Sequence, residues 1–167
     1  IGDFNGDGKN DYIRQEEGSR QNSSAYVFVS NDDGSFSRSI LFENASKRGD
    51  HVNIIIGDFN GDKKDDFIRQ EKGLADNNNL GTAELYISKG NGTFFREEIA
   101  DNNSLKGDYT NIIVGDFDNN GRDDFIRQSK VTYNHDTAQI FVSNGNGNFK
   151  KVLLKDYQAM QANLANI

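Results

Sequence analysis

Three short acidic loops carry the residues of this sequence that are best suited to chemistry. In the first loop, GDFNGDGKND, oxygen-bearing side chains stand at alternate places, which we number from Asp3 as place 1. Alternate residues of a tight loop converge on one point, and Ca²⁺ takes about 6 to 8 hard oxygen ligands of this kind, whereas Mg²⁺ fits less well. The predicted ligands of this first site are Asp3, Asn5, Asp7, the carbonyl oxygen of Lys9, and Asp11.

The same loop recurs twice, so the metal prediction does not depend on one motif. The copies begin at Gly57 and Gly115, which lie 55 and then a further 58 residues along the chain. Three carboxylates crowded into each loop would repel one another without a cation. We therefore expect Ca²⁺ as a cofactor, one ion per repeat and up to three in all. The ligands predicted at the same places are Asp58, Asn60, Asp62, the Lys64 carbonyl and Asp66, and then Asp116, Asp118, Asn120, the Arg122 carbonyl and Asp124.

The loops differ in detail, and a metal-free alternative exists. Place 6 is glycine in the first and third loops but Lys63 in the second, which we expect to strain the turn or weaken that site. Place 5 of the third loop is the neutral Asn120. The alternative is that all three loops are only turns closed by Asp and Asn side chains. Recurrence of one ligand spacing in three copies favours the metal.

The unit around each loop has the pattern of four short strands. An apolar, β-branched run precedes the loop, a short strand follows it, an AYVFVS-type strand comes next, and a Gly/Asn/Asp hairpin leads to the fourth. In the second unit the first three strands are predicted at Val52–Ile56, Phe67–Gln70 and Ala83–Ser88. Helical character is predicted only for Tyr157–Ala165.

Tandem recurrence of this unit predicts an all-β fold of four-stranded antiparallel blades of a β-propeller. Near-continuous apolar strands such as YVFV suit a sheet that is covered on both faces. We expect blade repeats at residues 2–56, 57–114 and 115–167, the last one incomplete. Propellers close with about 4 to 8 blades, so we expect the three blades to be a segment of a larger propeller. The alternative is a pair of copies that complete one ring together.

Composition narrows the possible partners. The net charge of −7 argues against nucleic acid, because phosphate binding needs a basic face. Cysteine is absent, so neither disulfide bonds nor thiolate metal sites can form. No apolar run approaches the roughly 20 residues that span a bilayer, and we expect no membrane insertion.

The pattern D-x-[DN]-x-[DN]-G-x-x-D after an apolar strand, within a GDFNGDGK-type unit, resembles the FG-GAP or VCBS repeats. Such repeats build integrin α-subunit propellers and occur in many secreted bacterial and fungal proteins, and the resemblance covers nearly the whole chain. It implies that the loop between the first two strands of a blade binds Ca²⁺ and fixes blade geometry. An EF-hand is excluded, because place 12 is Arg14, Arg69 or Arg127 where an EF-hand has glutamate.

These observations lead us to expect a non-catalytic scaffold or recognition module of a larger extracellular or cell-surface protein. Calcium loops of this type fill at extracellular concentrations, which favours secretion. An enzyme is not expected, since the metal loops account for nearly every carboxylate cluster and His51 and His135 lie in different loops. The alternatives are a carbohydrate-binding lectin propeller and a spacer module of a secreted toxin or enzyme.

Partners other than calcium are expected at the loops in which the copies differ most. These loops, between the second and third strands, are Glu17–Ser24, Lys72–Thr82 and Lys130–Thr137, and they suit a glycan or protein ligand. Further blades of the same chain, or a second copy, are also expected partners. The tripeptide Arg48-Gly49-Asp50 is interpreted as a turn of the repeat, because Lys106 fills the corresponding place in the next unit.

Overall fold

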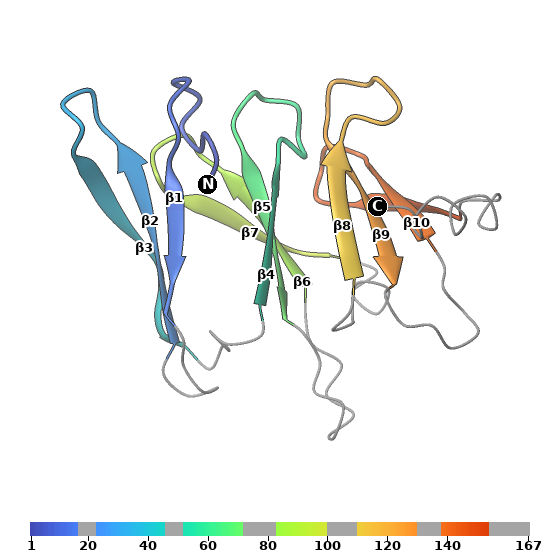
Figure 1. Cartoon of the computed structure of the whole chain (residues 1–167), viewed down its shortest axis with the longest axis horizontal. Helices are drawn as coiled ribbons and strands as arrows, with labels where there is room; N and C mark the ends of the chain where they lie inside the picture. Colours follow the sequence, from blue (N-terminus) through green and yellow to red (C-terminus); the bar gives the residue numbers. More distant parts are fainter. Residues whose placement is uncertain (17–22, 46–51, 72–82, 100–109, 130–137, 154–167) are drawn as a thin grey trace, which may run out of the picture.

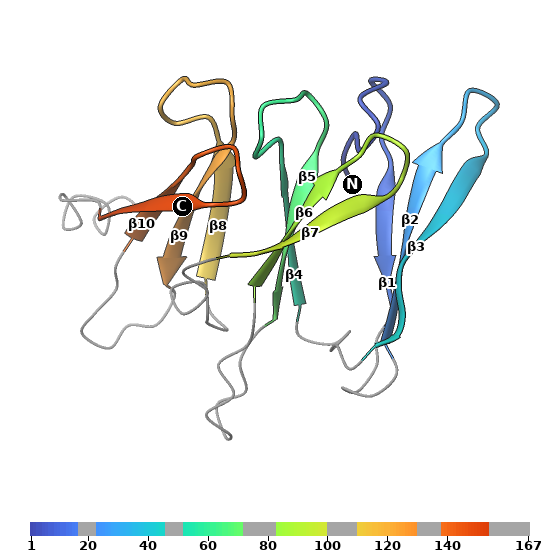
Figure 2. The same cartoon turned by 180° about the vertical axis from the view of Figure 1, so that it is seen from behind.

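The chain folds into three antiparallel β-sheets (Figure 1, Figure 2). The structure is a computed structural model that describes residues 1–16, 23–45, 52–71, 83–99, 110–129 and 138–153. In these residues it contains strands and no helix, which confirms the all-β prediction, while Tyr157–Ala165 lies outside them. The part of the chain described therefore has no helix long and apolar enough to cross a membrane.

The strands of each sheet follow one another in chain order. The first sheet consists of β1 (Tyr12–Gln15), β2 (Ser23–Ser30) and β3 (Phe36–Ala45). The second consists of β4 (Val52–Gly57), β5 (Asp66–Glu71), β6 (Ala83–Ser88) and β7 (Phe94–Glu98). The third consists of β8 (Thr110–Gly115), β9 (Asp124–Ser129), β10 (Ala138–Ser143) and β11 (Phe149–Leu153).

Each acidic loop joins an apolar strand to the strand that pairs with it. In the second sheet the loop connects β4 to β5, and Gly57 pairs with Asp66 at its base. In the first sheet only the corresponding bridge between Gly2 and Asp11 is present. All three loops lie at the same end of the sheets, the upper end in Figure 1. A sheet thus starts one strand before its loop, whereas the sequence repeat starts at the loop.

Both faces of the central sheet are buried by its neighbours. Successive side chains of a strand point to opposite faces, so Leu85 of β6 packs toward the third sheet and Tyr86 toward the first. Arg69 is also fully buried, and its Nε donates to Gln15 Oε1 of the first sheet at 3.4 Å. Burial of both faces explains why these strands are nearly continuous in apolar residues.

Each acidic loop has a phenylalanine at place 2, here called the plug, and the plugs of the first two loops join one sheet to the next. Phe4 and Phe59 are 0% and 1% exposed. Each lies edge-on to two rings of the following sheet, at centroid distances of 5.5 to 6.3 Å. These two rings belong to a group of three, here called the cradle. The cradles are Tyr12, Phe28 and Phe36 in the first sheet, Phe67, Tyr86 and Phe94 in the second, and Phe125, Phe141 and Phe149 in the third.

Consecutive acidic loops are also joined by paired hydrogen bonds, here called the clasp. The Asp3 N–H donates to Asp65 Oδ2 at 2.7 Å, and the Asp65 N–H donates back to the Asp3 carbonyl oxygen at 2.8 Å. Asp58 and Asp123 repeat the same pair at 2.9 and 2.8 Å. The clasp thus links place 1 of one loop to place 8 of the next.

The clasp leaves no room for a side chain at the residue before place 1. A Cβ atom on Gly57 would lie 2.7 Å from Val114 Cγ1 and 2.9 Å from Asp123 Oδ2. On Gly2 it would lie 2.8 Å from Asp65 Oδ2. Glycine is therefore required there by the close approach of the following repeat.

Replacement of this glycine should be costly only where a following repeat is present. We expect Gly57→Ala to lower the free energy of unfolding by about 1–3 kcal/mol through overpacking. Gly115→Ala is the matched control, because its nearest neighbour would be Phe117 Cζ at 3.7 Å, and it should change stability by less than about 0.5 kcal/mol. Urea denaturation in dilute solution measures both, and equal losses would contradict the clasp.

Candidate metal centres

The first acidic loop is wound around the side chain of Asp3. Oδ1 of Asp3 accepts hydrogen bonds from the N–H groups of Gly6 at 2.8 Å and Asp7 at 3.1 Å, and its Oδ2 accepts one from Gly8 at 2.8 Å. Gly6 and Gly8 make this possible with φ angles of 77° and 84°, a region that glycine enters without steric cost. One carboxylate at place 1 thus organises the whole turn.

The second and third loops have the same backbone arrangement. Asp58 accepts from Gly61 at 2.7 Å and from Lys63 at 2.7 Å. Asp116 accepts from Asn120 at 3.0 Å and Gly121 at 2.8 Å, and these bonds, with the Gly121 N–H first, lower the pKa of Asp116. Because the three backbones match, the predicted ligands at places 1, 3, 5, 7 and 9 occupy equivalent positions.

The aspartate at place 9 is buried at the base of every loop. Asp11, Asp66 and Asp124 are 1%, 0% and 0% exposed. Oδ1 of each accepts a hydrogen bond at 2.8 to 2.9 Å from the N–H of the serine that ends the second strand after the loop, which is Ser30 of β2, Ser88 of β6 or Ser143 of β10. In the first and third loops Oδ2 accepts from the N–H of the plug phenylalanine, at 2.9 and 3.1 Å.

The second loop leaves one oxygen of its place-9 aspartate available. Oδ2 of Asp66 is buried without a hydrogen-bond partner among the described residues, since the Phe59 N–H donates to the Gly57 carbonyl oxygen at 3.1 Å instead. Burial, reinforced by the negative charges of Asp62 and Asp58, raises the pKa of Asp66 to about 7. A cation in this loop would offset both the burial of the carboxylate and the repulsion.

The third loop brings three carboxylates together. Ligand oxygens of Asp116, Asp118 and Asp124 all lie within 4.8 Å of one another, the only such acidic group in the described residues. Two of these aspartates are exposed and one is buried. Hard oxygen ligands converging from one loop are what Ca²⁺ requires, so the residues present fit this ion.

The first and second loops are arranged differently, because place 3 is asparagine and the third carboxylate stands at place 5. Asp7 and Asp62 form ion pairs with the lysine at place 7, Lys9 at 3.1 Å and Lys64 at 2.7 Å. Hydrogen bonds from the Asn5 side chain and then the Lys9 N–H lower the pKa of Asp7. The structure thus places all fifteen predicted residues in three equivalent loops, but gathers three carboxylates only in the third.

Two kinds of residue that matter here were missed by the sequence reasoning. The clasp aspartates, Asp65 and Asp123, stand outside the predicted ligand places and join neighbouring loops. The strand-ending serines also cross between sheets: Ser143 Oγ donates to the Phe59 carbonyl oxygen at 2.6 Å, and Ser88 Oγ donates to that of Phe4. The recurrence of serine at the end of the AYVFVS-type strand was the signal available for the second kind.

Comparison with known families bears on residues 3–68, which run from the first acidic loop through the second and into β5. These residues match a family model described as an FG-GAP-like repeat. The matched segment belongs to the FG-GAP-like repeat family. No curated protein matches the chain. The matched segment thus contains two of the three acidic loops and the clasp between them, and the third loop repeats their backbone arrangement.

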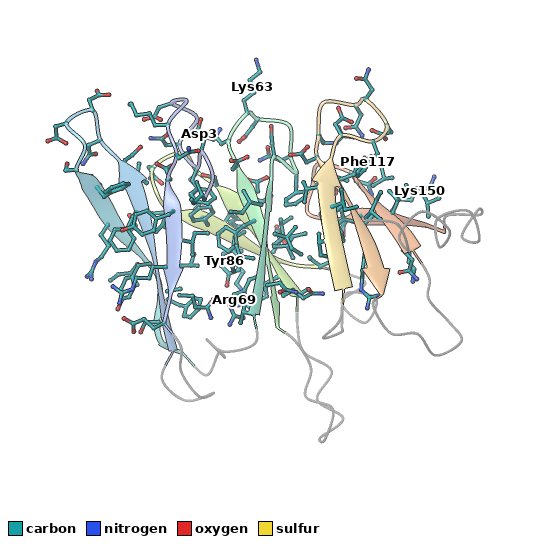
Figure 3. All side chains as sticks on the ribbon, in the orientation of Figure 1. Asp3, Lys63, Arg69, Tyr86, Phe117 and Lys150 are labelled. Atoms are coloured by element: carbon teal, nitrogen blue, oxygen red, sulfur yellow. The ribbon has the colours of Figure 1, made fainter. Side chains whose placement is uncertain are left out.

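Lys63 is the main difference between the second loop and the other two, because place 6 is glycine in both of those loops. Its φ is 67°, a left-handed conformation that lysine rarely adopts. Its N–H nevertheless donates to Asp58 Oδ2 as glycine does in the other loops. Figure 3 shows its side chain extending from the tip of the loop, away from the sheet. The departure therefore strains the backbone locally without changing the hydrogen bonds of the turn.

Several predicted features fall outside the described residues. The tripeptide Arg48-Gly49-Asp50 does, as do nearly all residues of the three variable loops between the second and third strands. The interpretation of the tripeptide as a turn, and the expectation of a glycan or protein ligand at the variable loops, remain predictions.

Relief of the strain at Lys63 should stabilise the fold. The left-handed conformation costs an L-residue about 1–2 kcal/mol. Glycine avoids this cost, but it loses more chain entropy on folding, which lowers the free energy of unfolding by about 0.5–1 kcal/mol. Lys63→Gly should therefore raise the free energy of unfolding by about 0.5–1 kcal/mol. Lys63→Ala removes the charge but keeps the Cβ atom, and it should leave stability nearly unchanged. Thermal and urea melts compare the two; an equal gain from alanine would assign the effect to charge.

Proposed function

We propose that this chain is a calcium-binding β-propeller segment that serves as a non-catalytic scaffold or recognition module of a larger extracellular or cell-surface protein. The observation that carries the proposal is the group of Asp116, Asp118 and Asp124 within 4.8 Å of one another. Two equivalent loops elsewhere in the chain and the buried, unpartnered Asp66 Oδ2 support it.

A metal ion in these loops would act on the geometry of the sheets. The place-1 aspartate organises its loop through its side chain and holds the next loop through its backbone. The place-9 aspartate is anchored to the serine that ends β2, β6 or β10 of its own sheet. An ion bound by both residues would fix the angle between a loop, its sheet and the following sheet, which is a structural role.

The propeller part of the proposal is supported by the repeating junction between sheets. Plug, cradle and clasp occur in the same form between the first and second sheets and between the second and third. A junction that repeats with fixed geometry builds a regular array, and propellers are such arrays. The partners of this chain would be calcium, further blades, and a glycan or protein ligand bound by the variable loops. Calcium loops of this type fill at extracellular Ca²⁺ concentrations, which favours a secreted protein.

Calcium should stabilise the chain measurably. A ligand that binds only the folded state contributes about 2.7 kcal/mol per site at 100 times its Kd. The melting temperature should therefore rise with added Ca²⁺, respond less to Mg²⁺, and fall in a chelator. Differential scanning calorimetry after exhaustive chelation is the measurement. An unchanged melting temperature would leave the three loops as metal-free turns.

The third loop should lose affinity when one carboxylate is neutralised. Asp118→Asn keeps an oxygen at place 3 and gives the loop the asparagine found at Asn5 and Asn60. Because affinity follows ligand charge, we expect at least about tenfold weaker Ca²⁺ binding, followed through the Gly121 amide resonance during titration. The control is Asp32→Asn, which removes the same charge from a side chain that is 93% exposed and pairs with Lys9 of the first loop, away from the third loop that is followed here. Equal affinities in the two variants would contradict ligation by Asp118.

A further inference from the structure

Six asparagines of this chain are followed directly by glycine, and such a pair can react within itself. Glycine has no side chain to hinder a close approach, so its backbone nitrogen can reach the side-chain carbonyl carbon of the preceding asparagine. The attack requires that the glycine N–H is not held by another acceptor. The six pairs begin at Asn5, Asn60, Asn91, Asn120, Asn144 and Asn146.

In four of these pairs the glycine N–H is already bonded. Three of the four lie in the acidic loops, where the glycine donates to the place-1 aspartate at 2.7 to 2.8 Å. In the fourth, the Gly145 N–H donates to Ser143 Oγ at 3.1 Å. Such a bond must break before the nitrogen can attack, and bonds to a carboxylate are the strong ones. We call these four pairs the protected pairs.

The other two pairs occupy equivalent places in two hairpins, one between β6 and β7 and one between β10 and β11. The N–H groups of Gly92 and Gly147 donate to no acceptor among the described residues. The asparagines that precede them, Asn91 and Asn146, are both exposed. The backbone nitrogen is therefore not held in these two pairs.

Asn91 differs from Asn146 in the donors that meet its side-chain oxygen. Thr93 Oγ1 donates to Asn91 Oδ1 at 2.6 Å, and the Thr93 N–H donates to the same atom at 3.1 Å. The ring closed by the N–H bond contains the Gly92 nitrogen, so the side chain is folded over the peptide that would attack it. At Asn146 both bonds, from Asn148, are 3.4 Å long. Donors at about 2.7–3.1 Å stabilise an oxygen that gains negative charge.

We propose that Asn91 is a site of spontaneous deamidation, in which Gly92 supplies the nucleophile and Thr93 stabilises the charge on Oδ1. Solvent takes the proton of the Gly92 N–H, the nitrogen forms a bond to Asn91 Cγ, and the carbonyl electron pair moves onto Oδ1. When the pair returns, the Cγ–Nδ2 bond breaks and Nδ2 takes up a proton and leaves as ammonia, so a cyclic imide remains. Water then opens the imide at either carbonyl carbon, which gives aspartate or isoaspartate.

The first sheet indicates that the aspartate product fits this place. Asp33 is the equivalent residue in the hairpin between β2 and β3, and its Oδ1 accepts from Ser35 Oγ at 2.6 Å and from the Ser35 N–H at 2.9 Å. These bonds, with the hydroxyl first, lower the pKa of Asp33. An ionised carboxylate is therefore accommodated where Asn91 stands in the second sheet.

The isoaspartate product would fit less well. It carries an additional methylene group in the backbone next to Gly92. A Cβ atom on Gly92 would already lie 3.0 Å from both Ser39 Oγ and Val29 Cγ2 of the first sheet, so the backbone has little room to lengthen. We therefore expect isoaspartate, and not aspartate, to loosen the packing of this hairpin on the first sheet.

Peptide mapping by mass spectrometry tests the proposal on the folded chain. The chain is incubated in mildly alkaline buffer with added Ca²⁺ and digested at acidic pH, and each asparagine is scored for conversion of amide to acid. Asn91 should react at least about tenfold faster than each protected pair, the factor that one net hydrogen bond adds through the barrier. Asn146 should fall between them. The proposal is overturned if Asn91 stays an amide, or if Asn146 or a protected pair reacts as fast.

The same measurement in urea separates the effect of structure from that of sequence. Unfolding removes the hydrogen bonds, and every one of the six asparagines still precedes a glycine. The six rates should therefore converge. If Asn91 keeps the same lead in urea, its lead comes from the local sequence and the structural argument fails.

Variants at Thr93 test the stabilisation of the charge on Oδ1. Thr93→Val keeps the shape of the side chain but removes the hydroxyl, and it should slow deamidation of Asn91 about tenfold. Thr93→Ser is the matched control, because it keeps the hydroxyl and should keep the rate. A hairpin that is merely loosened would react faster, so an unchanged or faster Thr93→Val variant overturns the role of Thr93. This hairpin contains none of the predicted calcium ligands, so the calcium titrations are judged separately.

Discussion

The central sheet has two apolar faces, and each of them is buried by packing against a neighbouring sheet. Only 34% of the residues are hydrophobic and no disulfide bond is possible, so stability depends on this mutual burial. The plug contributes to this burial directly, because a buried phenylalanine from one loop lies edge-on to two rings of the next sheet. An arrangement of this kind extends in one dimension, because each sheet packs only against its neighbours.

The acidic loops add an electrostatic problem to the same junctions. Burial raises the pKa of Asp65 and Asp123 at the clasps, and the negative charges of nearby loop aspartates, Asp58 among them, act in the same direction. The backbone N–H groups of the loops neutralise part of this charge, as they do around Asp3. A divalent cation would neutralise more of it. The charged loops and the apolar plugs are therefore parts of one junction and not separate features.

The sequence was sufficient for the features that recur locally. The three loops, the turn glycines, the strand that follows each loop and the all-β class were predicted from spacing and β-propensity, and the structure agrees in the residues it describes. It was not sufficient for differences among copies. Place 5 offers a carboxylate in Asp7 and Asp62, yet each pairs with a lysine two residues later, so charge counting alone overstated how alike the loops are.

The sequence by itself determined which residues form each loop and strand, because turns and hairpins depend on neighbours a few residues away. Only the tertiary structure decided which of the equivalent residues are buried. Phe59 and Phe117 occupy the same place in the repeat, but one is 1% and the other 46% exposed. Asp65 likewise becomes a clasp only because Asp3, more than sixty residues earlier, lies against it. Periodic sequence specifies identical units, whereas burial depends on whether a neighbouring sheet lies against each face.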